Sequence, residues 1–201
     1  MFYFMEKRDN NFVAMQKNDS EMNSSFPLFV YGTLKKGFSN YERHCTTAVS
    51  VEKAWCWGRL YDLDAGYPAM EIPEVCIQAV GTSAYLLDAQ QKGKVVNFDA
   101  PHGDWDLVQG ELMWFSHPAQ EIPPIDLLED FDPEGGNNLY ERVLVTIKTE
   151  EELLNAWTYV MTSSQHGGKR VSSNQSGVAE WLSQDSGYIG ESQTAASLQA
   201  R

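Results

Sequence analysis

A glycine turn near the start of the chain is the first feature that could do chemistry. The apolar run 28–31 is typical of a strand, which breaks at Gly32 into a turn over residues 33–37 and then a polar helix start. Backbone N–H groups at such a break point outward without partners, so they could hold an anion or the oxyanion of a reacting carbonyl. An ordinary strand–turn–helix junction would have the same sequence. A phosphate loop is excluded, because Gly-x-x-x-x-Gly-Lys-Ser/Thr is absent.

An acidic segment over residues 125–136 contains the second candidate group. Glu129 differs from its acidic neighbours because Leu128 and Phe131 flank it, and Ile125 lies one turn before it on the same helical face. Such surroundings would raise the pKa of the Glu129 carboxyl toward neutrality, as a general base requires. A helix-end carboxylate exposed to water is the alternative that the residues leave open.

The cysteines and histidines offer little further chemistry. The three cysteines are well separated and form no Cys-x-x-Cys pair, so we expect reduced thiols in a cytoplasmic protein. The four histidines show no ligand spacing, and we predict no metal site, although a composite site assembled by the fold stays open.

Composition limits the partners. The 201 residues carry 15 Lys and Arg against 28 Asp and Glu, a formal net charge of −13. Nucleic acid and anionic membranes both select clustered positive charge, so we expect neither as a partner. No stretch approaches the roughly 20 apolar residues of a membrane helix, and the apolar start meets Glu6, Lys7 and Arg8 too soon for a signal peptide. The charge and cysteine patterns do not indicate an oligomeric state.

Three regions follow from local composition. Residues 1–25 and 183–201 are polar and aperiodic, so we predict disordered extensions around one domain at residues 26–182.

We expect strands at 28–31, 54–62, 79–87, 107–115, 139–148 and 153–162, the last apolar on both faces and therefore central. We expect helices at 39–46, capped by Ser39, and at 122–131. Strands outnumber helices and do not alternate with them, which predicts an α+β fold built on a small mixed β-barrel. The polar segment 88–106 is either a surface excursion or a flap.

Eight short motifs together resemble the γ-glutamylcyclotransferase-like family in type and order. The resemblance spans about residues 28–162, and the motifs lie at residues 31–34, 58–62, 66–70, 108–112, 125–129, 131–133, 140–143 and 156–159. The resemblance implies a small barrel-like α+β fold with one pocket and no cofactor. It also implies a small-molecule γ-glutamyl substrate, which is converted to 5-oxoproline and free amine by an amide-cleaving lyase that acts through intramolecular acyl transfer.

The resemblance also assigns site residues. The family's turn, which binds the γ-glutamyl group, corresponds to Tyr31, Gly32, Thr33 and Leu34, and its catalytic glutamate corresponds to Glu129. The Tyr-x-Arg pair corresponds to Tyr140 and Arg142, of which we expect Tyr140 to contact substrate.

Two departures from the family leave the substrate open. Asp130 stands where the family has glycine, which would place a like charge beside the base, and the 88–106 segment could reshape the pocket mouth. Three alternatives therefore stay open: a non-catalytic module that binds γ-glutamyl-like ligands, an enzyme that removes γ-glutamyl from a larger amine, and an interaction protein.

Overall fold

The structure, a computed structural model, describes residues 25–161 and 167–182. The predicted domain at 26–182 falls almost entirely within these ranges. The predicted extensions lie outside the described residues, apart from Ser25, which is buried just before the first strand.

The strands and helices follow the predicted mixed composition. In chain order they are β1 (Phe26–Val30), α2 (Ser39–His44), β2 (Ser50–Asp62), β3 (Pro68–Glu71), the 3₁₀ turn η1 (Glu74–Cys76), β4 (Ala79–Val80), α3 (Tyr85–Gln90), β5 (Asp106–Phe115), α4 (Pro118–Glu121), α5 (Pro123–Leu128), β6 (Tyr140–Thr149), β7 (Leu153–Met161), β8 (Lys169–Arg170) and β9 (Val178–Ala179).

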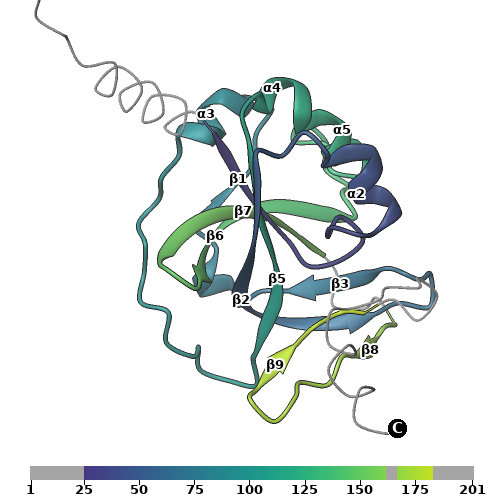
Figure 1. Ribbon diagram of the computed structural model, residues 1–201, viewed down its shortest axis with the longest axis vertical. Coiled ribbons are helices and arrows are strands. Elements are labelled where there is room, and N and C mark those ends of the chain that lie inside the picture. The colour runs from purple at the N-terminus through teal and green to yellow at the C-terminus, as the bar shows by residue number, and fades with distance from the viewer. Residues whose placement is uncertain (1–24, 162–166, 183–201) are drawn as a thin grey trace, which may run out of the picture.

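Five strands close into a barrel. Their order is β2-β5-β1-β7-β6, and β6 pairs back onto β2, where Ala54 and Trp55 face Thr149 and Lys148. The β1–β7 pair is parallel, and the other barrel pairs are antiparallel. Short helices cover one end of the barrel, while β3, β8 and β9 lie at the other (Figure 1). The predicted small mixed α+β barrel is confirmed.

Two apolar clusters explain why β1 and β7 are apolar on both faces. One cluster receives one face of all five barrel strands, including Phe29 of β1 and Val145 of β6, and fills the interior. The other packs the outer faces of β1, β5 and β7 against Ile122 and Ile125 of the helical layer. The predicted central position of residues 153–162 follows, because β7 contributes alternate side chains to both clusters.

The predicted strand at 79–87 is wrong beyond its first two residues. Only Ala79 and Val80 pair with β6, and the chain then turns into α3. The buried carboxylate of Asp88 accepts hydrogen bonds from the Thr82 backbone N–H (2.8 Å) and the Thr82 hydroxyl (2.9 Å). These bonds hold a tight turn that an extended strand could not make.

The helix boundaries also differ from the predictions. Helix α2 begins at Ser39, but its N-cap is Phe38 and no side chain caps it, so the predicted Ser39 cap is wrong. The predicted helix at 122–131 ends earlier: α5 stops at Leu128 and leaves Glu129 at its C-cap.

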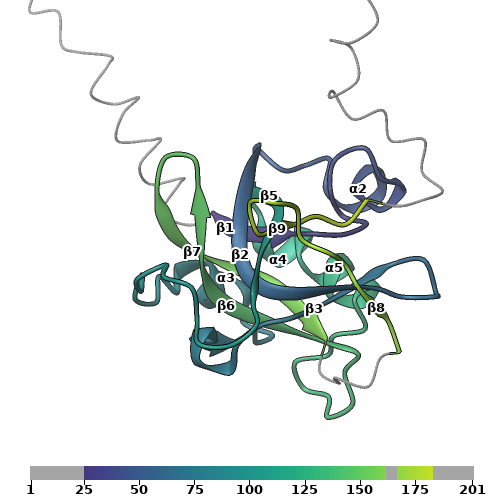
Figure 2. The same ribbon diagram turned by 90° about the horizontal axis from the view of Figure 1, so that it is seen from below.

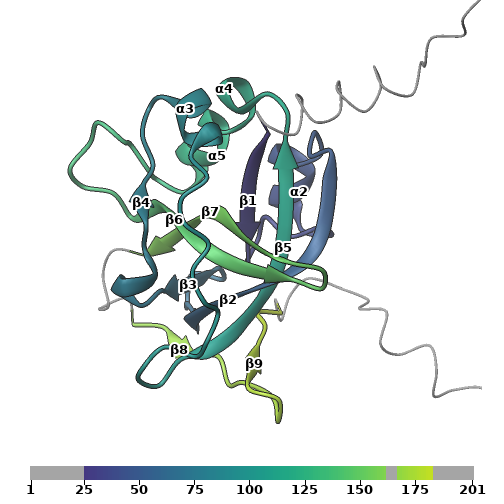
Figure 3. The ribbon, with the colours of Figure 1, turned by 90° about the vertical axis from the view of Figure 1, so that its left-hand side faces the viewer.

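The polar segment continues from α3 as a long strap (residues 91–105) that runs down the outside of the barrel (Figure 3). Its backbone is fixed to the barrel strands: Asn155 Nδ2 donates to the Lys92 carbonyl (2.6 Å), and Trp57 Nε1 donates to the Phe98 carbonyl (3.0 Å). The strap therefore lies against barrel strands along its length rather than projecting from them.

Candidate active site

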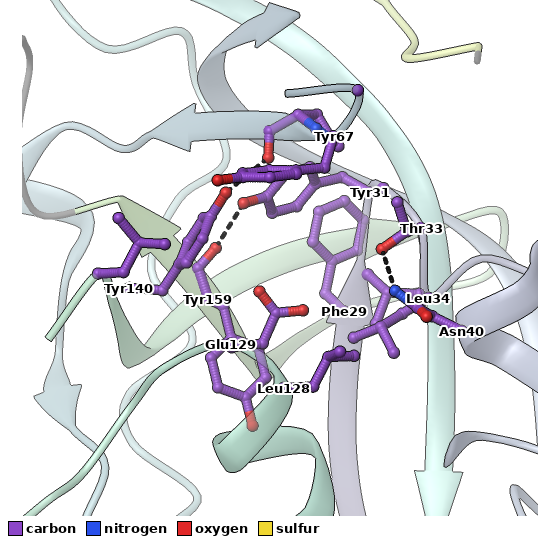
Figure 4. Close-up of a pocket in the computed structure, with 15 residues that line it drawn as sticks. Phe29, Tyr31, Thr33, Leu34, Asn40, Tyr67, Leu128, Glu129, Tyr140 and Tyr159 are labelled. Atoms are coloured by element: carbon purple, nitrogen blue, oxygen red, sulfur yellow. Dashed lines mark hydrogen bonds between the residues drawn. The ribbon is translucent and has the colours of Figure 1, made fainter. Parts of the chain in front are cut away.

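A pocket of about 420 Å³ opens where β1 ends. The side chains around it come from β1, the following turn, the β2–β3 connection, the end of α5, β6 and β7 (Figure 4). The residues that line it are Phe29, Val30, Tyr31, Gly32, Thr33, Leu34, Asn40, Gly66, Tyr67, Pro68, Leu128, Glu129, Leu139, Tyr140 and Tyr159. All six residues predicted to act on a ligand are among them, whereas Arg142 and the strap are not.

Three residues of the glycine turn, Gly32, Thr33 and Leu34, line this pocket. The Lys35 N–H donates to the Gly32 carbonyl (3.0 Å) and closes the turn, and Asn40 Nδ2 donates to the Thr33 hydroxyl (3.0 Å). Within the described ranges, no acceptor is found for the N–H groups of Gly32, Thr33 or Leu34. Donors of this kind can bind a carboxylate or a developing oxyanion.

Gly32 is required by a close approach rather than by its backbone angles. A Cβ atom at this position would lie 2.5 Å from Cγ of Pro68, whose ring packs directly against the turn. Any larger residue would push the turn away from the β2–β3 connection and misplace the neighbouring N–H groups.

Glu129 is positioned by the way α5 ends. The N–H of Phe131 donates to the Asp126 carbonyl (2.9 Å) and that of Asp130 to the Leu127 carbonyl (3.4 Å), the two bonds of a Schellman motif. The motif requires a left-handed residue after the C-cap, and Asp130 has φ 51°. Glu129 is thereby held at the helix end with its carboxylate directed into the pocket (Figure 4).

Burial and a neighbouring charge shift the acidity of Glu129. Loss of hydration raises the pKa of its carboxyl to about 7, and the Asp126 carboxylate adds to the shift. The like charge that acts on Glu129 is therefore that of Asp126, not that of the adjacent Asp130 expected from the sequence. A carboxyl with a pKa of about 7 can both accept and return a proton near neutral pH.

Replacing Asp130 with glycine is expected to stabilise the protein by roughly 0.5–1 kcal/mol, because glycine adopts the left-handed conformation without a steric cost. Asp130 is the sole non-glycine residue with positive φ in the described part of the chain. Urea unfolding of D130G measures the effect. The matched change Asp64→Gly, at an exposed turn residue without positive φ, should destabilise the protein. A D130G protein no more stable than the parent would contradict this account of the helix end.

Two tyrosines form one wall of the pocket. The Tyr31 hydroxyl donates to the Tyr159 carbonyl (2.9 Å), and the Tyr140 hydroxyl donates to the Pro68 carbonyl (2.9 Å). Burial is the largest cause that raises the pKa of each phenol, so both stay neutral. Because their protons are already donated to backbone carbonyls, these side chains shape the pocket.

A buried ionic cluster lies behind Tyr159. Arg142 Nη1 contacts the Asp126 carboxylate, Arg142 Nη2 contacts Asp88 Oδ2 (2.8 Å), and the Tyr159 hydroxyl donates to Asp126 Oδ1 (2.6 Å). Arg142 is fully buried. It thus holds α3 and α5 against β6 rather than contacting a ligand.

Nine of the lining residues were not predicted to act on a ligand, and three of these have polar side chains: Asn40, Tyr67 and Tyr159. Tyr67 and Tyr159 fall within motifs that resemble the family, but nothing in their spacing shows that they face the pocket. The position of Asn40 could have been used to predict its role, because an amide side chain early in the helix after the turn can donate a hydrogen bond back to Thr33.

Other site chemistries find little support among the described residues. Burial, together with the charges of Glu129 and Glu111, raises the pKa of the Cys45 thiol to about 12, so it is a poor nucleophile. All three cysteines are free. Residues 25–161 and 167–182 contain no group of three His, Cys, Asp or Glu placed to hold a metal. Nor do they form a helix of the length and apolarity that would cross a membrane.

Comparisons with known proteins point to one family. The chain matches the family described as "Gamma-glutamyl cyclotransferase, AIG2-like" over residues 28–100 and 95–181. It is 27% identical, over 72% of each chain, to the gamma-L-glutamyl-butirosin B gamma-glutamyl cyclotransferase of Niallia circulans. It is 31% identical to a Halalkalibacterium halodurans protein provisionally named as a gamma-glutamylcyclotransferase, over 55% of this chain and 68% of that one.

Among solved structures, the chain is similar to an AIG2-like protein of Mus musculus. The TM-score is 0.43 and the identity 14%, over 80% of this chain and 98% of that one.

Proposed function

The chain belongs to the gamma-glutamyl cyclotransferase, AIG2-like family, and from this premise we propose that it converts a γ-glutamyl amide to 5-oxoproline and a free amine, with Glu129 as the general acid and base. The observation that carries the proposal is the arrangement of one pocket. A carboxyl with a pKa of about 7 lines the same cavity as residues 32–34 of the glycine turn, whose N–H groups have no acceptor within the described part of the chain.

The substrate supplies its own nucleophile. Its α-amine attacks its γ-carbonyl and closes a five-membered lactam, so no serine or cysteine nucleophile is needed. Holding the substrate in this folded conformer exploits intramolecularity, for which effective molarities of about 10⁵–10⁸ M are known. The tyrosines and the turn supply the walls that select this conformer.

Glu129 handles the proton. Its carboxylate takes a proton from the substrate ammonium, which frees the amine to attack, and the ring nitrogen gives up a second proton to water once the C–N bond has formed. An α-amine has an ordinary pKa of about 8, close to that of Glu129, so the free energy of proton transfer between them is close to zero. The resulting oxyanion is held by the N–H groups of residues 32–34. Glu129 then gives the proton to the leaving nitrogen, the original amide bond breaks, and 5-oxoproline and amine are released.

The mechanism predicts the pH dependence of kcat/KM. Below pH 7 Glu129 is protonated and cannot accept the ammonium proton. The acid limb of the kcat/KM profile should therefore fall tenfold for each pH unit below an apparent pKa of about 7. Initial rates across pH 5–9 in a constant-ionic-strength buffer measure this limb. D126N removes the neighbouring negative charge and should move the limb to lower pH. A limb near pH 4.5 in the parent would contradict the role of Glu129.

A panel of γ-glutamyl dipeptides and γ-glutamyl amines, with 5-oxoproline detected by mass spectrometry, tests the function itself. Release from at least one compound is expected. Saturable binding of the panel with no product would instead support a non-catalytic module.

A bulky leaving amine is the second candidate substrate class. The Niallia circulans relative is named for a γ-glutamyl derivative of butirosin B, and the pocket rim carries Leu128 and Leu139, which are 37% and 40% exposed. Turnover of bulky γ-glutamyl amines but not of γ-glutamyl dipeptides would select this class.

A further inference from the structure

The lysine that closes the glycine turn is buried. The side chain of Lys35 is 6% exposed, an unusual environment for a charged group, which must then find partners. Its Nζ lies 3.2 Å from Glu180 Oε1 and donates to the Trp181 carbonyl at 2.9 Å. Both partners belong to the C-terminal segment of the domain, far from the turn in sequence.

That segment is itself anchored on the barrel. β9 pairs with β5 in parallel, with Val178 opposite Leu107 and Ala179 opposite Val108. The buried Trp181 ring packs on Phe38, with ring centres 5.5 Å apart, and its Nε1 donates to Asp62 Oδ1 at 2.7 Å. Figure 2 shows the C-terminal ribbon running from β9 toward α2. The residues that hold Lys35 are therefore themselves held in place by strand pairing and by the contacts of Trp181.

Lys35 and its partners lie outside the pocket lining, which includes Gly32, Thr33 and Leu34. Lys35 is the residue whose N–H closes the turn onto Gly32, so its position sets the direction of the N–H groups between them. On the other side of the turn, the Lys36 N–H donates to Glu111 Oε2 of β5 (2.7 Å). The turn thus depends on supports contributed by distant parts of the chain.

We infer that residues 178–181 form a clamp that orients the N–H groups of residues 32–34 through Lys35, making Lys35, Glu180 and Trp181 positioning residues of the reaction. The catalytic part of this inference rests on the proposed function. Its structural part does not, because the clamp fixes the turn whatever ligand the turn holds. A misplacement of about 1 Å can cost a reaction about 10²-fold, so a loosened turn should be visible in the rate.

The test compares two adjacent lysines. Lys35→Met keeps the apolar stem and removes the charge, whereas Lys36→Met makes the same change at an exposed side chain. For K35M we expect kcat on the best panel substrate to fall about 10–100-fold with less than a threefold change in KM. Amide hydrogen exchange in peptides covering residues 31–38 should accelerate, while exchange in β6 and β7 stays unchanged. K36M should match the parent in both readouts, and K35R, which keeps a charged donor, should recover most of the activity.

Glu180→Ala provides a second, milder variant, because Glu180 is 33% exposed and its removal leaves Lys35 bonded to Trp181. It should accelerate exchange at residues 31–38 less than K35M does, and it serves in place of K35M if that variant does not fold. Exchange at residues 31–38 that is unchanged in both variants would overturn the clamp, whatever the activity. Absence of 5-oxoproline from the parent protein would overturn the proposed function alone, since the exchange measurement still decides the clamp.

Discussion

Replacing Glu129 with glutamine is expected to lower kcat by about 10³–10⁴-fold, the upper part of the range for loss of general acid–base catalysis. Glutamine has nearly the same shape and can occupy the same C-cap position, but it cannot take the ammonium proton or return it to the leaving nitrogen. Ligand affinity should stay within a few fold, because the turn and the tyrosines are unchanged. Steady-state kinetics and calorimetric titration with 5-oxoproline measure the two quantities.

The stability of the same variant provides a second readout. The pKa of Glu129 is raised from 4.5 to about 7 in the folded state, so the folded protein binds the extra proton more tightly than the unfolded chain does. Glu129 therefore destabilises the fold progressively as pH rises from 4.5 to 7. The melting temperature of E129Q should exceed that of the parent at pH 8, and the difference should shrink at pH 5. The exposed residue Glu74, changed to glutamine, should alter neither activity nor this pH dependence. Undiminished 5-oxoproline release by E129Q would refute the assignment of Glu129.

Replacing Arg142 with methionine is expected to cost about 3–5 kcal/mol of folding free energy, because the change leaves buried charges without their partner. Asp88 and Asp126 would then face each other across α3, α5 and β6 with no cation between them. Since a domain of this size is stable by only about 5–15 kcal/mol, the variant should lose a large part of its stability. Urea unfolding monitored by tryptophan fluorescence measures the loss.

Arg170 provides the matched control for Arg142. It pairs with Asp106 at 2.6 Å but is 30% exposed, and loss of such a surface pair costs about 0–1 kcal/mol. Adding D88N and D126N to R142M should recover part of the lost stability, since neutral amides no longer repel each other. A cost for R142M no greater than that for R170M would show that this cluster contributes little to the fold.

The glycine at position 81 explains how Arg142 reaches its partners. A Cβ atom there would lie 2.5 Å from Arg142 Nε. Gly81 thus leaves room for the guanidinium between β4 and α5. This requirement is visible only once the three segments are assembled.

Local patterns predicted the barrel strands well, because each has an apolar face that matches the strand period. They also predicted a raised pKa for Glu129, since Ile125, Leu128 and Phe131 surround it in sequence. They failed where a distant residue decides the conformation. Residues 81–87 leave the strand because Asp88 is held by Thr82 and Arg142, a partnership that no local pattern records.

The sequence also did not indicate which charged groups lie near Glu129 and Lys35. Asp130 adjoins Glu129 in the chain, yet it is not among the causes that raise the pKa of Glu129, whereas Asp126, one turn earlier, supplies the effective charge. Lys35 and Lys36 look alike in the sequence. Only the C-terminal segment, which arrives from the far end of the domain, makes one of them buried and leaves the other exposed.

The position of β1 delays closure of the barrel until late in synthesis. β1 is made first but lies between β5 and β7, so Leu28 pairs with Met113 on one side and Trp157 on the other. At ribosomal speeds of about 5–20 residues per second, the β1 strand spends on the order of ten seconds without its second neighbour. The barrel can therefore close only after β7 has left the ribosome, and a nascent chain that stops before residue 153 exposes the apolar surface of β1 to aggregation.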